Sequence, residues 1–561
     1  MKRLLLLLLC VCSLSAFAQT FKNPIIQGGY PDPSITTDGE YYYIVNSSFE
    51  YFPGLPIHRS KDLVNWEFAG YGLHRIDQCN GKMNLVDVQQ NGGIHAPTIR
   101  YHEGKFYIIT TNVYLPNKEG APAEMINFII TADNITGPWS EPHIIEGAPG
   151  IDPDIFFDED GTVWFTGTHS PENPNYEGEG EIWTQQLDIV NWKLKGERHY
   201  LYRGACGGVW VEGPHLYKHD GRYYLMVAEG GTSYNHAMMI AVSDHITGPY
   251  VSNERNPILT TRNLSYDNWV NSTGHADIIQ LKDGRWYMVA LGIRGDEERA
   301  SNMGRETFLI PVQWEKETFW WKEPKYEWPV VAPATGRVMK EEALPFADQP
   351  QMRNDAYEDN FDQAILGYEW NFRRVPREKT YSLDARKGYL RIYAHPQKIA
   401  LRERASLMGI RQKETKFEYS AKMNFKPKKQ GVEAGLSIFQ KDDNYINFTI
   451  VKKDGVSMIQ LAVAEKKQAP KVIKTTALDS YEGDVILKID ARGNEYQYLY
   501  SLDQGVTYLL LGTTPTNILL SYGWNSGYTG AYVGIYATSN GGNAKEYADF
   551  DWVNYKGFEQ E

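Results

Sequence analysis

Three acidic residues of this chain lie in short motifs that resemble one another. Asp32 occurs in YPDPSI, Asp152 in IDPDIF and Glu212 in EGPHLY. Two carboxyl groups on opposite sides of a bond can act as general acid and general base in hydrolysis. A third carboxylate near the acid raises the pKa of the acid by charge repulsion and keeps it protonated near neutral pH. Taken alone, Pro31-Asp32-Pro33 is more simply explained as a turn, so the surrounding pattern must decide.

The acidic motifs belong to a pattern that occurs five times between Tyr30 and Val289. Each copy contains a branched apolar residue, a short polar turn that ends in glycine, and an aromatic strand, which predicts antiparallel hairpins. The turn glycines are Gly39, Gly104, Gly161, Gly221 and Gly284, with spacings of 65, 57, 60 and 63 residues. Five such units predict an all-β fold, a five-bladed β-propeller, with an irregular β-sandwich as the alternative.

A propeller places the first strand of each blade along a central axis, so equivalent positions of the copies face one another. Aligned on the apolar residue, the positions in register are Asp32, Ala96, Asp152, Gly213 and His275. The positions one residue earlier include His95 and Glu212. Three carboxylates and two histidines from distant parts of the sequence are therefore expected to meet at one end of the axis.

The amino-terminal segment and the charge limit the classes of function. Residues 1–18 combine a basic start, an apolar run and an Ala-x-Ala site before Gln19, which is typical of a secretory signal peptide. We therefore expect export, to the periplasm, without a membrane anchor. Loss of Lys2 and Arg3 with this segment changes the formal charge from −13 to −15, which argues against nucleic acid as a partner.

The mature chain is too long for one ordinary core, so more than one domain is expected. The repeat ends near residue 330, and the Pro- and Ala-rich residues 331–355 predict a linker. Residues 356–561 contain short alternating strands separated by turns, which predict a β-sandwich of the jelly-roll type. The predicted organisation is a signal peptide (1–18), a propeller (19–330), a linker (331–355) and an accessory sandwich (356–561).

Several motifs in this order resemble glycoside hydrolase family 43, the family of inverting β-xylosidases and α-L-arabinofuranosidases. The resemblance covers nearly all of the mature chain and is carried by residues 23–35, 47–66, 150–158, 212–217, 272–278 and 304–307. It implies that Asp32 is the general base, Glu212 the general acid, and Asp152 the residue that tunes the pKa of the acid and orients it. Asp154, two residues further on, is the alternative for the tuning role.

The resemblance also implies a sugar-binding shell. Phe49 would flank the terminal sugar, Arg305 would hydrogen-bond its hydroxyl groups, and His275 would lie beneath it on the axis. The corresponding alternatives are a core aromatic residue, a surface ion pair and a buried structural histidine. No cofactor requirement is expected, although some relatives carry an axial ion, so a structural calcium ion near His275 is left open.

The carboxy-terminal domain resembles the concanavalin-like domain of xylosidase members of the family. In such members a loop of this domain walls the pocket and makes the enzyme exo-acting. Residues 524–530 are the candidate loop, with Tyr528 as its substrate-binding residue.

One departure bears on specificity. Xylosidase-like relatives often have Trp-Ala-Pro-Asp where this chain has His95-Ala96-Pro97-Thr98, so a smaller imidazole forms part of the pocket wall. We expect an exo-acting, inverting glycosidase that releases terminal α-L-arabinofuranosyl units from hemicellulose side chains or oligosaccharides, with a β-D-xylosidase as the alternative. An endo-acting arabinanase and a sugar-binding propeller without catalysis are further alternatives.

Overall fold

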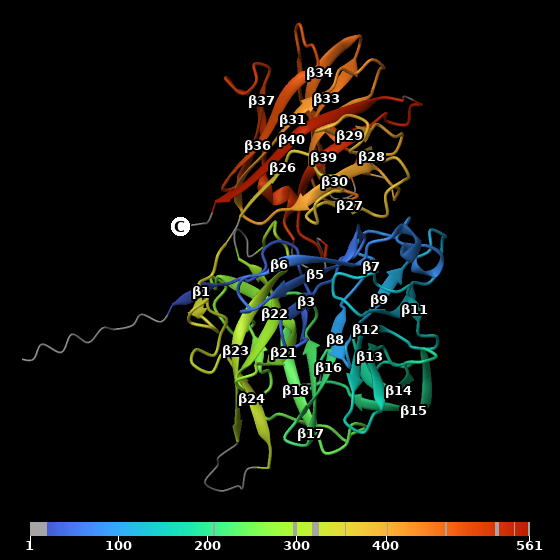
Figure 1. Ribbon diagram of the computed structural model, residues 1–561, viewed down its shortest axis with the longest axis vertical. Helices are drawn as coiled ribbons and strands as arrows, with labels where there is room; N and C mark the ends of the chain where they lie inside the picture. The colour runs from blue at the N-terminus through green and yellow to red at the C-terminus, as the bar shows by residue number, and fades with distance from the viewer. Residues whose placement is uncertain are drawn as a thin grey trace, which may run out of the picture.

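The structure is a computed structural model that describes residues 19–205, 208–295, 300–316, 325–353, 355–400, 402–465, 468–521, 527–543 and 545–558. The expected signal peptide lies outside these ranges. The described chain is almost entirely β-structure and forms a lower body, coloured blue to yellow, and an upper body, coloured orange to red (Figure 1).

The lower body contains five antiparallel sheets, one for each blade. Blade 1 contains β2 (Ser34–Thr37), β3 (Tyr42–Val45), β5 (Gly54–Ser60) and β6 (Glu67–Leu73). Blade 2 contains β7 (Gly93–Ile94), β8 (Thr98–His102), β9 (Lys105–Tyr114), β10 (Glu124–Ala132) and β11 (His143–Ile144). Blade 3 contains β12 (Ile151–Phe157), β13 (Val163–His169), β14 (Glu181–Asp188) and β15 (Lys193–Tyr202). Blade 4 contains β16 (Glu212–His219), β17 (Arg222–Glu229), β18 (Ala237–Ser243), β19 (Val251–Ser252) and β20 (Leu259–Thr260). Blade 5 contains β21 (Val270–Gln280), β22 (Trp286–Arg294), β23 (Glu306–Lys316) and β24 (Glu327–Val331).

The innermost strands of the blades form a closed ring. β2 contacts β8, β8 contacts β12, β12 contacts β16, β16 contacts β21, and β21 contacts β2 again. The predicted five-bladed β-propeller is therefore confirmed. The five repeat glycines have φ values of 91°, 82°, 82°, 73° and 87°, a left-handed conformation that favours glycine in hairpin turns.

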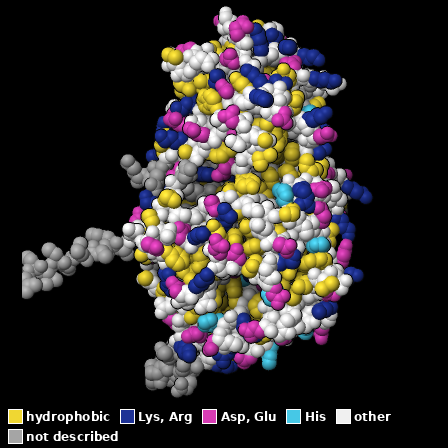
Figure 2. Space-filling view, in the orientation of Figure 1, with side chains coloured by type: hydrophobic (Ala, Val, Ile, Leu, Met, Phe, Trp, Pro, Cys, Tyr) yellow, Lys and Arg dark blue, Asp and Glu magenta, His cyan; other side chains and the backbone are white. Residues whose placement is uncertain are grey.

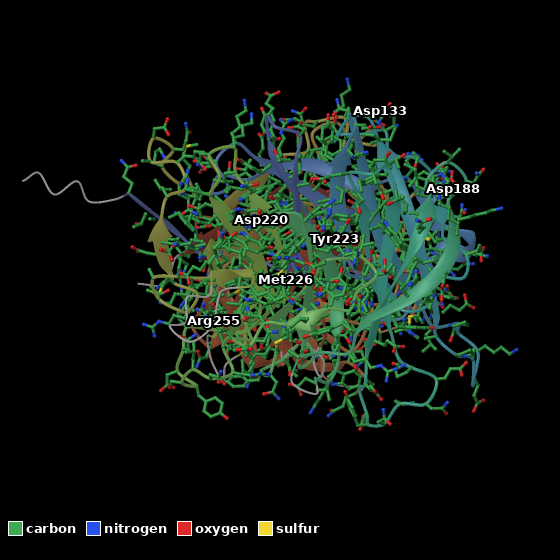
Figure 3. All side chains as sticks on the ribbon, turned by 90° about the horizontal axis from the view of Figure 1, so that it is seen from below. Asp133, Asp188, Asp220, Tyr223, Met226 and Arg255 are labelled. Carbon is green, nitrogen blue, oxygen red and sulfur yellow. The ribbon has the colours of Figure 1, made fainter. Side chains whose placement is uncertain are left out.

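The two ends of the propeller are formed by different turns and strand ends. Figure 3 shows the end away from the upper body, where Asp133 and Asp188 lie toward the outside and Tyr223 lies near the middle. Asp220 belongs to this end, because it follows β16 in the turn before β17. Strands β12 and β16 begin at the opposite end, so Ile151 and Glu212 lie there.

The upper body is a β-sandwich of two large antiparallel sheets, which confirms the predicted second fold. One sheet contains β26 (Ala356–Asp359), β28 (Tyr381–Ser382), β29 (Leu390–Tyr393), β31 (Lys416–Asn424), β36 (Asp484–Arg492), β37 (Glu495–Ser501), β38 (Leu509–Pro515) and β40 (Tyr547–Phe558). The other contains β27 (Asn371–Arg373), β30 (Ser406–Arg411), β32 (Glu433–Lys441), β33 (Asn444–Lys453), β34 (Val456–Ala464), β35 (Lys471–Ala477), β39 (Tyr532–Thr538) and β4 (Tyr51–Phe52). Short 3-10 helices occur at η1 (Ile76–Cys79), η2 (Gly81–Met83) and η3 (Thr516–Leu519).

The two bodies share a sheet and a hydrophobic core. Strand β4 comes from the propeller part of the chain, yet it pairs with β27 at the edge of a sandwich sheet. One buried apolar cluster includes Phe52 from the propeller and Phe372 from the sandwich. Next to β4, the buried Glu50 carboxylate lies 3.0 Å from the Arg373 guanidinium. These contacts fix the orientation of the sandwich relative to the blade that carries Phe49.

The segment expected as a linker carries regular structure. Strand β25 (Glu341–Ala343) pairs with β1 (Thr20–Lys22) near the amino terminus of the described chain. The Asn23 side chain also donates a hydrogen bond of 3.0 Å to the carbonyl oxygen of Leu309 in blade 5. Residues after β24 therefore attach the amino-terminal segment to the propeller before the chain enters the sandwich.

The visible surface carries charges of both signs, interspersed over both bodies (Figure 2). No helix formed by the described residues is long and apolar enough to cross a membrane. Cys79 is buried, and Cys206 lies outside the described residues.

Candidate active site

One cavity at the upper end of the propeller brings the predicted site residues together. Its lining includes all eight of them: Asp32, Phe49, His95, Asp152, Glu212, His275, Arg305 and Tyr528. Ala96, Ile151 and Thr232 complete the lining. The cavity therefore gathers the carboxylate, guanidinium and aromatic groups that can hold a sugar unit.

Four of the five positions that the repeat alignment places in register, all except Ala96, share an unusual backbone conformation. Asp32, Asp152, Gly213 and His275 have left-handed φ values of 52°, 53°, 57° and 39°. Strands β12, β16 and β21 each show a register shift at this level. Such bulges re-aim side chains, and left-handed non-glycine residues cost on the order of 1–3 kcal/mol and cluster at functional sites. The backbone is thus shaped so that these side chains enter the cavity.

Glycine is needed at position 213. A Cβ atom there would lie 2.9 Å from Cε1 of the His275 ring, which is closer than ordinary contacts allow. The absence of a side chain lets His275 pack against the backbone that follows Glu212. This contact joins blade 4 to blade 5 beneath the cavity.

Asp32 is buried but well supplied with partners. Nη1 of Arg305 donates to Oδ1 of Asp32 at 3.0 Å, and the Ser47 hydroxyl donates to Oδ2. Nδ1 of His275 lies 3.8 Å from the same carboxylate. Burial alone would raise the pKa of Asp32, but Arg305, His275 and Ser47 together hold it below its ordinary value. Asp32 is therefore ionised at neutral pH.

Glu212 and Asp152 have the opposite electrostatic environment. Burial, together with repulsion from Asp32, raises the pKa of Glu212 to about 7. Burial and repulsion from Glu212 and Asp32 raise the pKa of Asp152 well above its ordinary value. Because two buried, electrostatically coupled carboxylates in one cavity cannot both ionise easily, this pair keeps a proton near neutral pH. The backbone N–H of Gly213 donates to Oδ2 of Asp152 at 3.2 Å, so Asp152 also contacts the residue next to Glu212.

Asp154, the alternative for the tuning role, belongs to a different layer. Simple alternation along a strand would point Asp152 and Asp154 the same way, but the bulge in β12 separates them. Oδ2 of Asp154 accepts a hydrogen bond of 2.9 Å from the backbone N–H of Leu216, and Asp154 does not line the cavity. Asp152, and not Asp154, therefore lines the same cavity as Glu212.

Below the cavity, the axis is filled by an ionic group that we call the axial cluster, consisting of Arg100, Asp154, His215 and Asp277. The Arg100 guanidinium donates to Asp277 at 2.8 Å and to Asp154 at 2.9 Å, and it lies 3.1 Å from Nδ1 of His215. It also contacts the Ser34 hydroxyl at 3.3 Å, so one side chain of blade 2 reaches the other four blades.

The surroundings of His275 are a poor match for calcium, the axial ion left open by the sequence. Calcium takes six to eight oxygen ligands. Among the described residues, no group of three or more histidine, cysteine, aspartate or glutamate side chains is arranged to hold a metal ion. The Arg100 guanidinium already supplies a positive charge on the axis. We therefore assign no chemical step to a metal.

Aromatic and cationic side chains form one part of the cavity wall. The Phe49 ring stacks on the Tyr528 ring with centroids 5.3 Å apart, and the His95 ring meets Phe49 edge-on at 5.1 Å. The Arg305 guanidinium lies 5.5 Å from the Phe49 centroid and 5.4 Å from that of Tyr528. Phe49 is thus buried and yet lines the cavity, and Arg305 forms a buried ion pair rather than one on the surface.

The sandwich contributes Tyr528 to this wall. The Tyr528 carbonyl oxygen accepts hydrogen bonds from Arg305, and its backbone N–H donates to Oδ1 of Asn91 at 3.2 Å. Next to it, a Cβ atom on Gly304 would lie 2.6 Å from the backbone nitrogen of Gly530, so glycine permits this close approach. Residues 524–526 of the predicted loop lie outside the described residues, whereas residues 527–530 are placed as expected beside the cavity.

Comparison with known proteins identifies the family. Residues 21–319 match the family described as glycosyl hydrolases family 43, and residues 358–556 match the beta xylosidase C-terminal concanavalin A-like domain. The chain belongs to glycosyl hydrolase family 43. It is therefore a glycoside hydrolase, and the cavity at the upper end of its propeller is the candidate active site.

Individual relatives of this family 43 enzyme resemble it over almost their whole length. The chain is 37% identical over 539 residues to a xylosidase/arabinosidase of Butyrivibrio fibrisolvens, covering 94% of this chain and 98% of the relative. It is 36% identical over 562 residues to a non-reducing end alpha-L-arabinofuranosidase of Bacteroides ovatus, covering 99% and 98%. The crystal structure of a xylan beta-1,4-xylosidase from Bacillus halodurans C-125 has a TM-score of 0.86 at 29% identity, covering 96% of this chain and 100% of that one.

Sequence reasoning missed two polar residues of the site. Ser47 donates to Asp32, and it lies in the segment 47–66 that carries the family resemblance, so its motif was a usable signal. Thr232 lines the cavity and accepts a hydrogen bond of 2.8 Å from Nη1 of Arg305. It lies in a Gly-Gly-Thr-Ser loop whose sequence gives no indication of this contact.

Proposed function

We propose that this family 43 enzyme is an exo-acting, inverting α-L-arabinofuranosidase that removes terminal non-reducing arabinofuranosyl units from hemicellulose side chains or oligosaccharides. Asp32 is the general base, Glu212 the general acid, and Asp152 the group that modulates and orients the acid. Phe49, His95, His275, Arg305 and Tyr528 bind the terminal sugar. The observation that carries the proposal is the opposite direction of the pKa shifts of Asp32 and Glu212 in one cavity.

The proposed reaction is a single displacement. Protonated Glu212 gives its proton to the glycosidic oxygen as the bond from that oxygen to the anomeric carbon breaks. Ionised Asp32 takes a proton from a water molecule, whose oxygen forms the new bond to the anomeric carbon from the opposite face. The anomeric configuration therefore inverts, and a later exchange with solvent returns the proton to Glu212 and removes it from Asp32.

The substrate assignment is supported by the pocket wall and by a relative. The His95 ring packs on Phe49 and Tyr528, so an imidazole occupies the wall where an indole is common in xylosidase-like members. The Bacteroides ovatus relative at 36% identity is named as an α-L-arabinofuranosidase. β-D-Xylosidase activity is the second candidate, because the Butyrivibrio fibrisolvens relative is named as a xylosidase/arabinosidase.

Initial rates on matched aryl α-L-arabinofuranoside and aryl β-D-xyloside test the assignment. We expect the higher kcat/KM on the arabinofuranoside, and a higher value on the xyloside would transfer the assignment to β-xylosidase. Proton magnetic resonance of the first-formed anomer tests inversion. Internal cleavage of linear arabinan would indicate an endo-acting enzyme, and sugar binding without hydrolysis would indicate a non-catalytic propeller.

We further propose that residues 1–18 direct the protein to the periplasm and are removed before Gln19. The basic start, apolar run and Ala-x-Ala site support this proposal. Fractionation of cells that produce the full chain, with amino-terminal sequencing of the periplasmic product, tests it. Recovery of uncleaved protein from the cytoplasm would contradict it.

A further inference from the structure

In the proposed reaction the cavity holds the sugar that is released, and the rest of the substrate must extend out of the cavity on the side of Glu212. Glu212 protonates the glycosidic oxygen, so the leaving group begins at this carboxyl group. Phe49, His95 and Tyr528 close part of the cavity wall, and the sandwich packs against the propeller next to them. Binding residues for the leaving group should therefore be sought around the segment that precedes Glu212.

A large aromatic residue lies at this place. Trp210 precedes Glu212 by two residues, and 44% of its surface is exposed, although the neighbouring Val211 is buried. Trp210 does not line the cavity itself, so it lies outside the space for the terminal sugar. An exposed indole beside an acidic pocket offers an apolar face of the kind on which the C–H face of a sugar ring can pack.

The indole is held in a defined position by the backbone of two loops. A Cβ atom on Gly178 would lie 2.8 Å from Cε2 of Trp210, and one on Gly231 would lie 3.1 Å from Cδ1. Both glycines thus lie directly against the ring. Gly231 is followed by Thr232, which lines the cavity and contacts Arg305. Two cavity residues therefore lie close to Trp210 along the chain: Glu212 follows it by two residues, and Thr232 follows the glycine that lies against its ring.

The backbone of Trp210 has the same strained, left-handed conformation as that of Asp32 and Asp152. Its φ is 57°, a left-handed value that is a genuine outlier for a bulky side chain. Its backbone N–H donates to the carbonyl oxygen of Gly178 at 2.6 Å. A strained conformation that presents a large apolar ring to solvent is costly for stability alone, which points to a role in binding.

We propose that Trp210 is the stacking platform for the first sugar on the leaving-group side of the scissile bond. The occupant is a pyranose ring of the hemicellulose backbone, which packs its C–H face on the indole while its glycosidic oxygen faces Glu212. Trp210 thereby sets the preference for oligosaccharides over small leaving groups. This inference rests on the proposed function and names a second binding position for that same site.

The test compares two substrates that share the terminal sugar. One is an oligosaccharide with a backbone pyranose, and the other is the corresponding glycosyl fluoride, whose leaving group is a single atom. In Trp210→Ala we expect kcat/KM for the oligosaccharide to fall about tenfold, the loss expected from one well-placed aromatic contact, mainly through KM. We expect kcat/KM for the fluoride to stay within about twofold, and inhibition by the free pentose to be unchanged, because neither ligand reaches the platform.

Two further variants separate binding from folding. Trp210→Phe keeps a smaller aromatic face and should retain most of the oligosaccharide activity. Tyr547→Ala removes an aromatic residue of similar exposure, 43%, from the sandwich and should leave both substrates unaffected. Thermal unfolding midpoints of all three variants report whether the fold is intact.

Three outcomes overturn the inference. An equal loss on both substrates would assign Trp210 a structural role, and no loss on either would show that the leaving group binds elsewhere. Loss of the same size in Trp210→Phe as in Trp210→Ala would show that stacking is not the interaction. A wild-type protein that hydrolyses no pentosyl substrate would refute the proposed function as well, whereas the first three results leave that function intact.

Discussion

Two layers of buried carboxylates lie one above the other on the axis of this propeller, and in blade 3 the two layers are only two residues apart, at Asp152 and Asp154. The upper layer consists of Asp32, Asp152 and Glu212, and the lower layer is the axial cluster. In the lower layer Arg100 compensates both acids, and its guanidinium beside Asp277 keeps the pKa of that carboxyl well below its ordinary value despite burial. In the upper layer Arg305 pairs directly with only one of the three acids, Asp32.

The difference shows that pairing with a cationic side chain, rather than burial, distinguishes the structural carboxylates of the axial cluster from the proposed catalytic carboxylates above them. Both layers are removed from water, and desolvation raises the pKa in each. A paired carboxylate stays ionised and joins blades. In the upper layer only Asp32 is paired with a cation, so Asp32 is ionised, whereas Asp152 and Glu212 together retain a proton. Acid and base catalysis requires one ionised and one protonated carboxyl group of this kind.

Removal of the catalytic acids gives the largest expected effect. Asp32→Ala and Glu212→Ala should each lower kcat on an oligosaccharide by at least about 10³-fold, because general acid–base groups contribute about 10²–10⁴-fold and water must also be positioned. Steady-state kinetics on purified variants measures this. Glu212→Ala should lose much less on an aryl glycoside with an acidic phenol, since that leaving group needs no proton.

A control variant tests whether the loss is specific to the upper layer. Glu433→Gln removes a buried carboxylate from the sandwich and should leave kcat unchanged. Retention of more than about a tenth of the activity in Asp32→Ala would show that another group serves as the base.

Disruption of the lower layer should affect stability rather than chemistry. Arg100→Met leaves Asp154 and Asp277 buried without their cation, which costs roughly 3–5 kcal/mol of unfolding free energy. Denaturant unfolding measures the loss, and Arg100→Lys should recover part of it. Unchanged stability in Arg100→Met would mean that the axial cluster does not hold the blades together.

The pH profile sharpens the comparison within the upper layer. Glu212 acts while protonated, so kcat/KM should fall as the pH rises through its pKa of about 7. Asp32 acts while ionised and its pKa is lowered, so the acidic limb should lie below the ordinary range of a carboxyl group.

Asp152→Asn should move the basic limb to lower pH. The two carboxyl groups are coupled, and a neutral amide at position 152 removes the repulsion that an ionised Asp152 would exert on Glu212, so Glu212 loses its proton more easily. We expect a loss of about fivefold in kcat/KM at pH 7, because a downward shift of about one pKa unit lowers the protonated fraction of Glu212 from about a half to about a tenth. An unmoved basic limb would show that Asp152 is itself neutral in the active form and acts only by orienting Glu212.

The sequence was sufficient for the fold and for most of the cavity, because both follow from repetition. Five glycine turns give five hairpins, and positions in register on the innermost strands must meet, so Asp32, Asp152, Glu212 and His275 could be grouped before any coordinates. Tyr528 could be placed only through the family resemblance, because no local pattern tells which sandwich loop reaches the propeller.

Other features of the fold and the site could not be predicted from the sequence, for physical reasons. Alternation suggested that Asp152 and Asp154 point the same way, but the bulge in β12 breaks the period of two and sends them to different layers. Arg100 contacts the other four blades because its side chain is long and the propeller axis is narrow enough for it to reach them. The repeat pattern in the sequence does not predict these contacts. Strand β25 within the expected linker pairs with a strand some 320 residues earlier, beyond any local signal.

Chelation should give the smallest effect and tests the lower layer once more. If Arg100 supplies the axial positive charge, activity and unfolding midpoint should be unchanged after treatment with a chelator and removal of free metal. Calcium added afterwards should restore nothing. A chelator-sensitive enzyme whose activity returns with calcium would show that a metal ion binds near His275 in addition to the guanidinium. In that case Arg100 would supply only part of the positive charge that balances the buried carboxylates of the two layers.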